Sequence, residues 1–133
     1  MKEVEVELQE KAERYATRHG DSSIRLACTP RPPRLVVSLS GVLDTASSTD
    51  FHDFLRAAKQ AAAMSGGLAV DLRGVHYVSS TGIGILSAAM IEYTKDRIPF
   101  ALRCVPRKVQ DIFKMLGLWT YFAIDPDQTS CNE

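Results

Sequence analysis

Segments that resemble strands and segments that resemble helices alternate along this chain from about residue 35 to residue 124. Apolar, β-branched or aromatic runs typical of strands occupy residues 35–40, 68–72, 100–104 and 119–124, with a turn at Gly74 and a further apolar stretch over 75–78. Apolar residues recur at helical spacing between these runs, the first such helix including Phe51, Phe54, Leu55, Ala58, Ala62 and Met64. Because short links in such an alternation require parallel crossovers, the pattern predicts an α/β sandwich with a mainly parallel sheet.

Two further elements are expected before residue 35. Residues 24–28 are typical of a strand, and a proline-rich turn at 30–33 predicts a β-hairpin that makes the sheet mixed. Residues 1–20 predict a helix, with an apolar stripe formed by Val4, Leu8, Ala12 and Tyr15. That stripe must be buried either on its own domain or against a second copy, as a homodimer. The expected organisation is a helical extension (1–20), an α/β domain (24–124) and a polar tail (125–133).

Composition limits the class of protein. The chain has 133 residues, of which 45% are hydrophobic and 24% charged, as expected for one globular domain. Its 16 Lys and Arg residues balance 16 Asp and Glu residues, whereas a nucleic-acid-binding domain is usually strongly basic. No apolar run approaches the roughly 20 residues of a membrane span. The charged N-terminus lacks the apolar core of a signal peptide, so a cytoplasmic protein is expected.

Residues that commonly carry catalysis or metals are scattered. The spacing of Cys28, Cys104 and Cys131 predicts reduced thiols, and neither these nor the three histidines predict a metal site. Gly82-Ile83-Gly84 lacks the remainder of a nucleotide-binding loop, and no cofactor is expected. Hydrolysis at Ser80 with His76 as base is the weakest interpretation, because no nucleophile elbow surrounds the serine.

Three consecutive hydroxyl residues, Ser79-Ser80-Thr81, stand where an apolar run ends and a helix is expected to begin. One interpretation is a helix cap, which is worth about 0.5–2 kcal/mol. The other is a phosphorylation switch, since a helix N-terminus tolerates a phosphate. Gly82 and Gly84 would let a partner's backbone approach. Asp44 is predicted to cap the preceding helix in the same way.

Three motifs resemble the STAS domain of bacterial anti-sigma factor antagonists: LVVSLSGVLDTASSTDF (35–51), LAVDLRGVHYVSSTGIGIL (68–86) and ALRCVPRKVQDIFKMLGLWTYFAI (101–124). The resemblance covers about residues 24–124. The DSSG pattern of that family, whose first serine is regulated, falls on Ser79-Ser80-Thr81-Gly82, which makes Ser80 the matching residue. This chain departs from the family pattern with Ser79 in place of aspartate, Thr81 in place of the second serine, and Val42 in place of glutamate.

The resemblance implies a protein that binds an anti-sigma factor serine kinase and so releases a sigma factor. Phosphorylation of Ser80, with Ser79 and Thr81 as alternatives, would end binding, and a phosphatase would reset it. The partner-binding residues implied are Asp44, Ser79, Ser80, Thr81, Gly82 and Ile83. The alternative is a transporter-associated or signalling-scaffold STAS subunit without phospho-switching, since such relatives keep the fold while losing the DSSG pattern.

Overall fold

The computed structural model describes residues 2–30 and 33–125 of the chain. The elements, in order, are α1 (Lys2–Arg18), β1 (Ser23–Pro30), β2 (Pro33–Leu43), α2 (Thr45–Ala57), α3 (Lys59–Met64), β3 (Leu68–Val78), α4 (Ser80–Lys95), β4 (Phe100–Arg103), α5 (Arg107–Met115) and the 3-10 helix η1 (Trp119–Tyr121). The predicted N-terminal helix is therefore confirmed. No helix among the described residues is long and apolar enough to cross a membrane.

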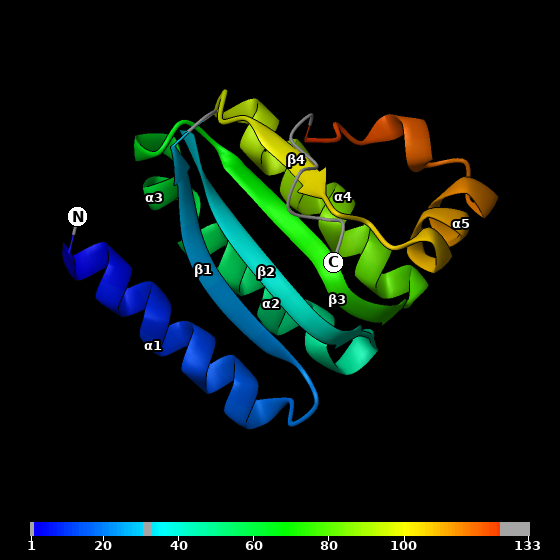
Figure 1. The fold of residues 1–133 in the computed structure, drawn as a ribbon, viewed down its shortest axis with the longest axis horizontal. Coiled ribbons are helices and arrows are strands. Elements are labelled where there is room, and N and C mark those ends of the chain that lie inside the picture. The colour runs from blue at the N-terminus through cyan, green and yellow to red at the C-terminus, as the bar shows by residue number, and fades with distance from the viewer. Residues whose placement is uncertain (1, 31–32, 126–133) are drawn as a thin grey trace.

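The four strands form one mixed sheet in the order β1-β2-β3-β4 (Figure 1). β1 and β2 make the predicted antiparallel hairpin, whereas β3 and β4 join in parallel. β3 runs without interruption to Val78, so the turn expected at Gly74 is wrong. Register shifts in the β2–β3 pairing, between Ser38 and Ser40 and between Gly41 and Val42, let Gly74 pair with Ser40 within the ladder.

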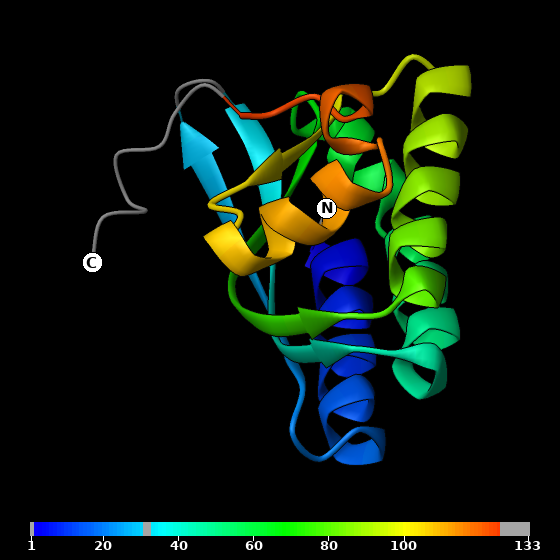
Figure 2. The ribbon, with the colours of Figure 1, turned by 90° about the vertical axis from the view of Figure 1, so that its right-hand side faces the viewer.

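Three helices, α1, α2 and α4, lie on one side of the sheet (Figure 2). The strands alternate accordingly, and Val37, Val70 and Leu102 are fully buried in the core that these helices cover. The neighbouring residues Asp71 and Arg103 have the opposite orientation and form an ion pair, with Arg103 Nε 3.8 Å from Asp71 Oδ2.

The apolar stripe of α1 packs against its own domain. Leu8, Ala12 and Tyr15 are 2–3% exposed and belong to the single hydrophobic core. The Tyr15 ring lies 6.1 Å from that of Phe51 on α2. The side chain of Val4 lies outside the described part of the chain. Of the two alternatives for the stripe, the structure therefore has the intramolecular one, and these residues offer no exposed surface to a second copy.

The strand predicted at 119–124 is wrong. α5 ends in a Schellman motif, in which Leu118 N–H donates to the Phe113 carbonyl (2.9 Å) and Gly117 N–H to the Lys114 carbonyl (3.0 Å). Gly117 adopts the left-handed φ of 71° that this motif requires. The chain then turns back, so that Trp119 and Phe122 pack around the Phe113 ring instead of forming a strand. Only a single bridge, from Leu102 to Ile124, is formed.

Two other expectations are corrected. The helix predicted to run to residue 64 breaks at Ala58 into α2 and α3, and Met64 is 55% exposed rather than part of the buried face. The expectation of reduced thiols is wrong for Cys104, which is disulfide-bonded. Cys28 is a free, exposed thiol. Cys131 lies outside the described residues.

Candidate functional site

The first turns of α2 and α4 lie side by side at the carboxyl edge of β2 and β3. The two parallel strands end together, with Leu43 opposite Val78, and each chain then turns directly into a helix. Ser79 N–H donates to the Leu43 carbonyl across 2.8 Å. The hydroxyl of Thr45 donates to that of Thr81 across 3.4 Å. Backbone and side-chain hydrogen bonds thus join the two helix N-termini into one surface.

Asp44 caps α2, as predicted. Its carboxylate accepts from the Ser47 backbone N–H (3.0 Å), and the Ser47 hydroxyl in turn accepts from the Asp44 N–H (3.1 Å), which completes a capping box. The Ser47 N–H, followed by the Ser47 hydroxyl, lowers the pKa of Asp44. Asp44 is only partly exposed and carries its negative charge at neutral pH.

The three hydroxyls of the following turn have different roles. Ser79 is the N-cap of α4, and its Oγ accepts from the Gly82 N–H across 3.0 Å. Thr81 is exposed and holds the hydroxyl bond to Thr45. Ser80 is the first residue of α4 and is exposed, and its side chain makes no hydrogen bond within the described part of the chain. The Ser80 hydroxyl is therefore the one of the three that the fold leaves unengaged.

The two glycines of the turn also differ. A Cβ on Gly82 would lie 2.6 Å from the Leu43 carbonyl oxygen, so the absence of a side chain there serves the fold itself. A Cβ on Gly84 would meet no atom within 4 Å. Ile83 is 1% exposed and lies in the core, so its side chain is not presented to a partner in this structure. Gly82 is buried as well.

Two exposed residues at or near this surface were not found by sequence reasoning. Thr45 follows the Asp44 cap and reaches Thr81, a contact that depends on how the two helices sit beside each other. Tyr77, one residue before the end of β3, is 50% exposed. Strand alternation could have indicated Tyr77, because its neighbour Val78 is buried and adjacent strand residues face opposite sides.

The groups that the site presents are carboxylate and hydroxyl oxygens. His76 is exposed on β3 and makes no hydrogen bond to Ser80 in the described structure, so the pairing of this histidine with the serine is not seen. Among the described residues, no group of three or more His, Cys, Asp or Glu side chains could hold a metal ion. What the surface offers is an ionised carboxylate on Asp44 and three exposed hydroxyls on Thr45, Ser80 and Thr81.

The fold and the turn define a small α/β sandwich whose candidate site is an exposed pair of helix N-termini. Residues 8–122 match the family model described as "Mlab, STAS domain", and the chain belongs to the STAS domain family. The match begins within α1 and ends just after η1. A comparison with curated protein sequences gave no match.

Solved structures with the same fold include anti-sigma factor antagonists. The antagonist SpoIIAA in its unphosphorylated form is 18% identical, with a TM-score of 0.62 over 79% of this chain and 90% of that one. An anti-sigma factor antagonist from Mycobacterium paratuberculosis is 20% identical (TM-score 0.58; 82% and 91% covered). The phosphorylated form of the Bacillus cell fate determinant SpoIIAA is 18% identical (TM-score 0.58; 81% and 95%). At these identities the likeness establishes the fold alone.

Proposed function

We propose that this protein is an anti-sigma factor antagonist, which binds an anti-sigma factor of the serine kinase class and is released when that kinase phosphorylates Ser80. The observation that carries the proposal is the difference between three neighbouring hydroxyls. Ser79 is held as the cap of α4 and Thr81 is bonded to Thr45, whereas the Ser80 hydroxyl is exposed and has no partner among the described residues. A kinase can therefore reach Ser80 without first breaking a hydrogen bond of its side chain.

Phosphorylation would act through charge and bulk. The Ser80 oxygen attacks the γ-phosphorus of the kinase's ATP, its proton is lost, and ADP leaves. The new group carries roughly −1.5 to −2 charge at pH 7. Because Ser80 is the first residue of α4, the positive end of the helix dipole accommodates that charge and the domain stays folded. A partner docked over the same turn would have to desolvate the phosphate, which opposes binding.

The partner would contact the exposed rim around Ser80. Asp44, Thr45 and Thr81 lie around the turn and present a carboxylate and hydroxyls. Gly82 and Ile83 support this rim from beneath, since both are buried. We assign them an indirect role in binding, by fixing the position of the α4 N-terminus against Leu43.

A capture experiment tests the proposal. Wild type, Ser80→Asp and Ser80→Ala are immobilised and exposed to extract from the source cells, and the bound proteins are identified by mass spectrometry. Wild type and Ser80→Ala should retain a serine kinase of the anti-sigma type, and Ser80→Asp should retain much less of it while melting at a similar temperature. Thr49→Asp, an exposed position within α2, is the matched charge control. Recovery of no kinase and no sigma-regulatory protein would contradict the proposal.

A second candidate is a STAS subunit of a transporter or signalling scaffold that has no phospho-switch. The observation that favours it is Ser79, which replaces the acidic residue of the DSSG pattern and serves as a helix cap. Under this alternative the capture experiment recovers a transporter or scaffold component, and wild type and Ser80→Asp retain it equally. A gene for a kinase or sigma factor beside this one favours the switch, whereas a transporter operon favours the alternative.

A further inference from the structure

A network of ion pairs lies on the side of the sheet away from α1, α2 and α4 (Figure 2). The Asp71 carboxylate lies 3.4 Å from the Arg73 guanidinium and 3.8 Å from that of Arg103. The Asp125 carboxylate lies 3.4 Å from Arg103 and 3.6 Å from Arg34. Asp71 and Arg103 are 6% exposed and Asp125 is 1% exposed. Because charged residues are seldom buried this deeply, the network lies where water is largely excluded.

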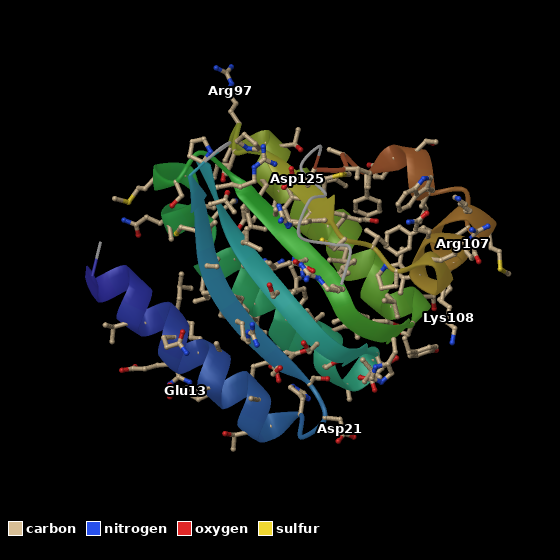
Figure 3. The ribbon with its side chains drawn as sticks, viewed as in Figure 1. Glu13, Asp21, Arg97, Arg107, Lys108 and Asp125 are labelled. Carbon is tan, nitrogen blue, oxygen red and sulfur yellow. The ribbon has the colours of Figure 1, made fainter. Side chains whose placement is uncertain are left out.

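The chain leaves the described part of the domain from within this network, because Asp125 is the last described residue. The Leu102 N–H donates to the Ala123 carbonyl across 2.9 Å, and the Asp125 N–H donates to the Leu102 carbonyl across 2.8 Å. Asp125 therefore lies beside β4, and the chain there runs parallel to that strand (Figure 3). Cys104 follows Leu102 by two residues, which is about 7 Å of strand. The chain at Asp125 is thus directed toward Cys104.

The partner of Cys104 follows by elimination. Cys104 is disulfide-bonded, and the chain holds three cysteines in all. Cys28 is a free thiol, which leaves Cys131. Cys131 follows Asp125 by six residues, and six residues can span up to about 20 Å. Since the two Cα atoms of a disulfide lie only about 4.4–6.8 Å apart, this length of chain is sufficient to reach Cys104.

The sequence between Asp125 and Cys131 complements the network in charge. In the described part of the chain, the network holds three guanidinium groups and two carboxylates. Residues 126–131 read PDQTSC, and Asp127 is the one charged residue among them. Their polar composition suits a polar face, and Asp127 would balance the additional positive charge. Arg73 Nη2 lies 3.7 Å from the Cys104 sulfur, so the disulfide adjoins the network.

We propose that a disulfide between Cys104 and Cys131 ties residues 126–131, the C-terminal segment, across this ion-pair network, and that reduction of the bond releases the segment. Formation of the bond takes two electrons and two protons from the two thiols and passes them to a disulfide oxidant, which becomes two thiols. A dithiol reductant reverses the transfer. The tied segment shields the ion pairs from water, and the closed loop restricts the unfolded chain, so the oxidised form is the more stable one. This response to redox conditions is independent of the proposed switch at Ser80.

Disulfide mapping tests the connectivity. Full-length protein is oxidised with glutathione disulfide, unfolded without reductant, treated with iodoacetamide and digested with trypsin, which places the three cysteines on separate peptides. Mass spectrometry should find peptides 104–107 and 115–133 linked to each other, with Cys28 outside any bond between peptides. A linked peptide that contains Cys28, or three alkylated cysteines, overturns the proposal.

Thermal melts and amide exchange test whether the bond ties the segment to the domain. Reduction of wild type with dithiothreitol should lower the melting temperature by about 5–15 °C. It should also accelerate exchange of the Leu102 and Asp125 amides, which lie beside the network. Cys131→Ser should melt like reduced wild type with or without dithiothreitol. Cys28→Ser, the matched control, should keep the full difference. Equal melting temperatures and exchange rates in oxidised and reduced wild type would overturn the proposal.

The rate of reduction tests where the segment lies. Asp127→Lys should speed reduction of the bond by dithiothreitol severalfold, because the segment then carries a charge that the guanidinium groups repel. Glu133→Lys changes the net charge by the same amount beyond Cys131 and should be reduced at the rate of wild type. Equal rates in these two variants would show that the segment does not lie on the network.

Discussion

Gly82 and Leu43 are in such close approach that a methyl group on residue 82 would lie 2.6 Å from the Leu43 carbonyl oxygen. Gly82→Ala should therefore destabilise the domain by about 1–3 kcal/mol, through displacement of α4 from the end of β2. Gly84→Ala is the matched control, because its new methyl group meets nothing, and it should stabilise the domain by about 0.5–1 kcal/mol. Chemical denaturation of both variants checks the pair. Equal effects would show that the turn is not packed as described.

The cap of α4 belongs to Ser79 and not to Ser80. Ser79→Ala removes the acceptor of the Gly82 N–H and should cost about 1 kcal/mol of unfolding free energy. Ser80→Ala should change stability by less than about 0.5 kcal/mol, because Ser80 is exposed and its hydroxyl has no partner in the described chain. Urea titrations of the two variants provide the test. A larger loss for Ser80→Ala would mean that the roles of the two serines are reversed.

The Asp44 cap should make stability depend on pH in acid. The Ser47 N–H lowers the pKa of Asp44 in the folded state, so the unfolded chain takes up the proton first as pH falls. The charge of Asp44 contributes fully to the free energy of unfolding above the pKa of about 3.9 that the residue has in the unfolded chain. This contribution is lost as the pH drops through the lower pKa of the folded state. Asp44→Asn keeps a capping side chain without this titration.

Melting temperatures of wild type and Asp44→Asn, measured between about pH 2 and pH 6, should therefore converge toward the acid end of the range. A difference that stays constant down to the lowest pH would show that the ionised carboxylate is not what the Ser47 N–H stabilises.

The helix α1 is an integral part of the core. Leu8 is 2% exposed, so Leu8→Ala should destabilise the domain by about 2–5 kcal/mol. Val6→Ala, at a site that is 57% exposed on the same helix, should have an effect within about 0.5 kcal/mol. Thermal melts check the pair, and sedimentation equilibrium run alongside reports the oligomeric state. If Leu8→Ala left stability unchanged but dissociated a dimer, the stripe would be an intermolecular contact.

The sheet could be predicted because its signals are local. The antiparallel hairpin could be predicted from the β-branched residues over 35–40 and from the prolines that follow residues 24–28. The parallel strands could be predicted because strand-like and helix-like segments alternate along the chain. The segment 119–124 failed because aromatic residues favour strands and also favour packing on a neighbouring helix. The Schellman motif at Gly117 turns the chain back toward α5, where Phe122 packs against Phe113. The sequence pattern alone does not reveal this contact.

The site could be located from sequence but not resolved into roles. Three hydroxyls before a helix indicate a cap. Which of them accepts the Gly82 N–H depends on the residue at which the helix begins, and a shift of one residue would change the answer. Likewise Gly82 and Gly84 are equivalent in sequence, whereas one faces the Leu43 carbonyl and the other faces solvent. The Thr45–Thr81 bond joins residues 36 apart in the chain and carries no sequence signal.

Phosphosite mapping tests the central claim most directly. The protein is purified from its own cells with phosphatase inhibitors present, digested, and sequenced by fragmentation mass spectrometry that resolves adjacent hydroxyl residues. The account predicts a fraction of molecules that carry one phosphate on Ser80, with Ser79 and Thr81 unmodified. That fraction should be depleted in the molecules that co-purify with the kinase. A phosphate on Ser79 or Thr81, or an unmodified turn in both bound and free protein under all growth conditions, would contradict it.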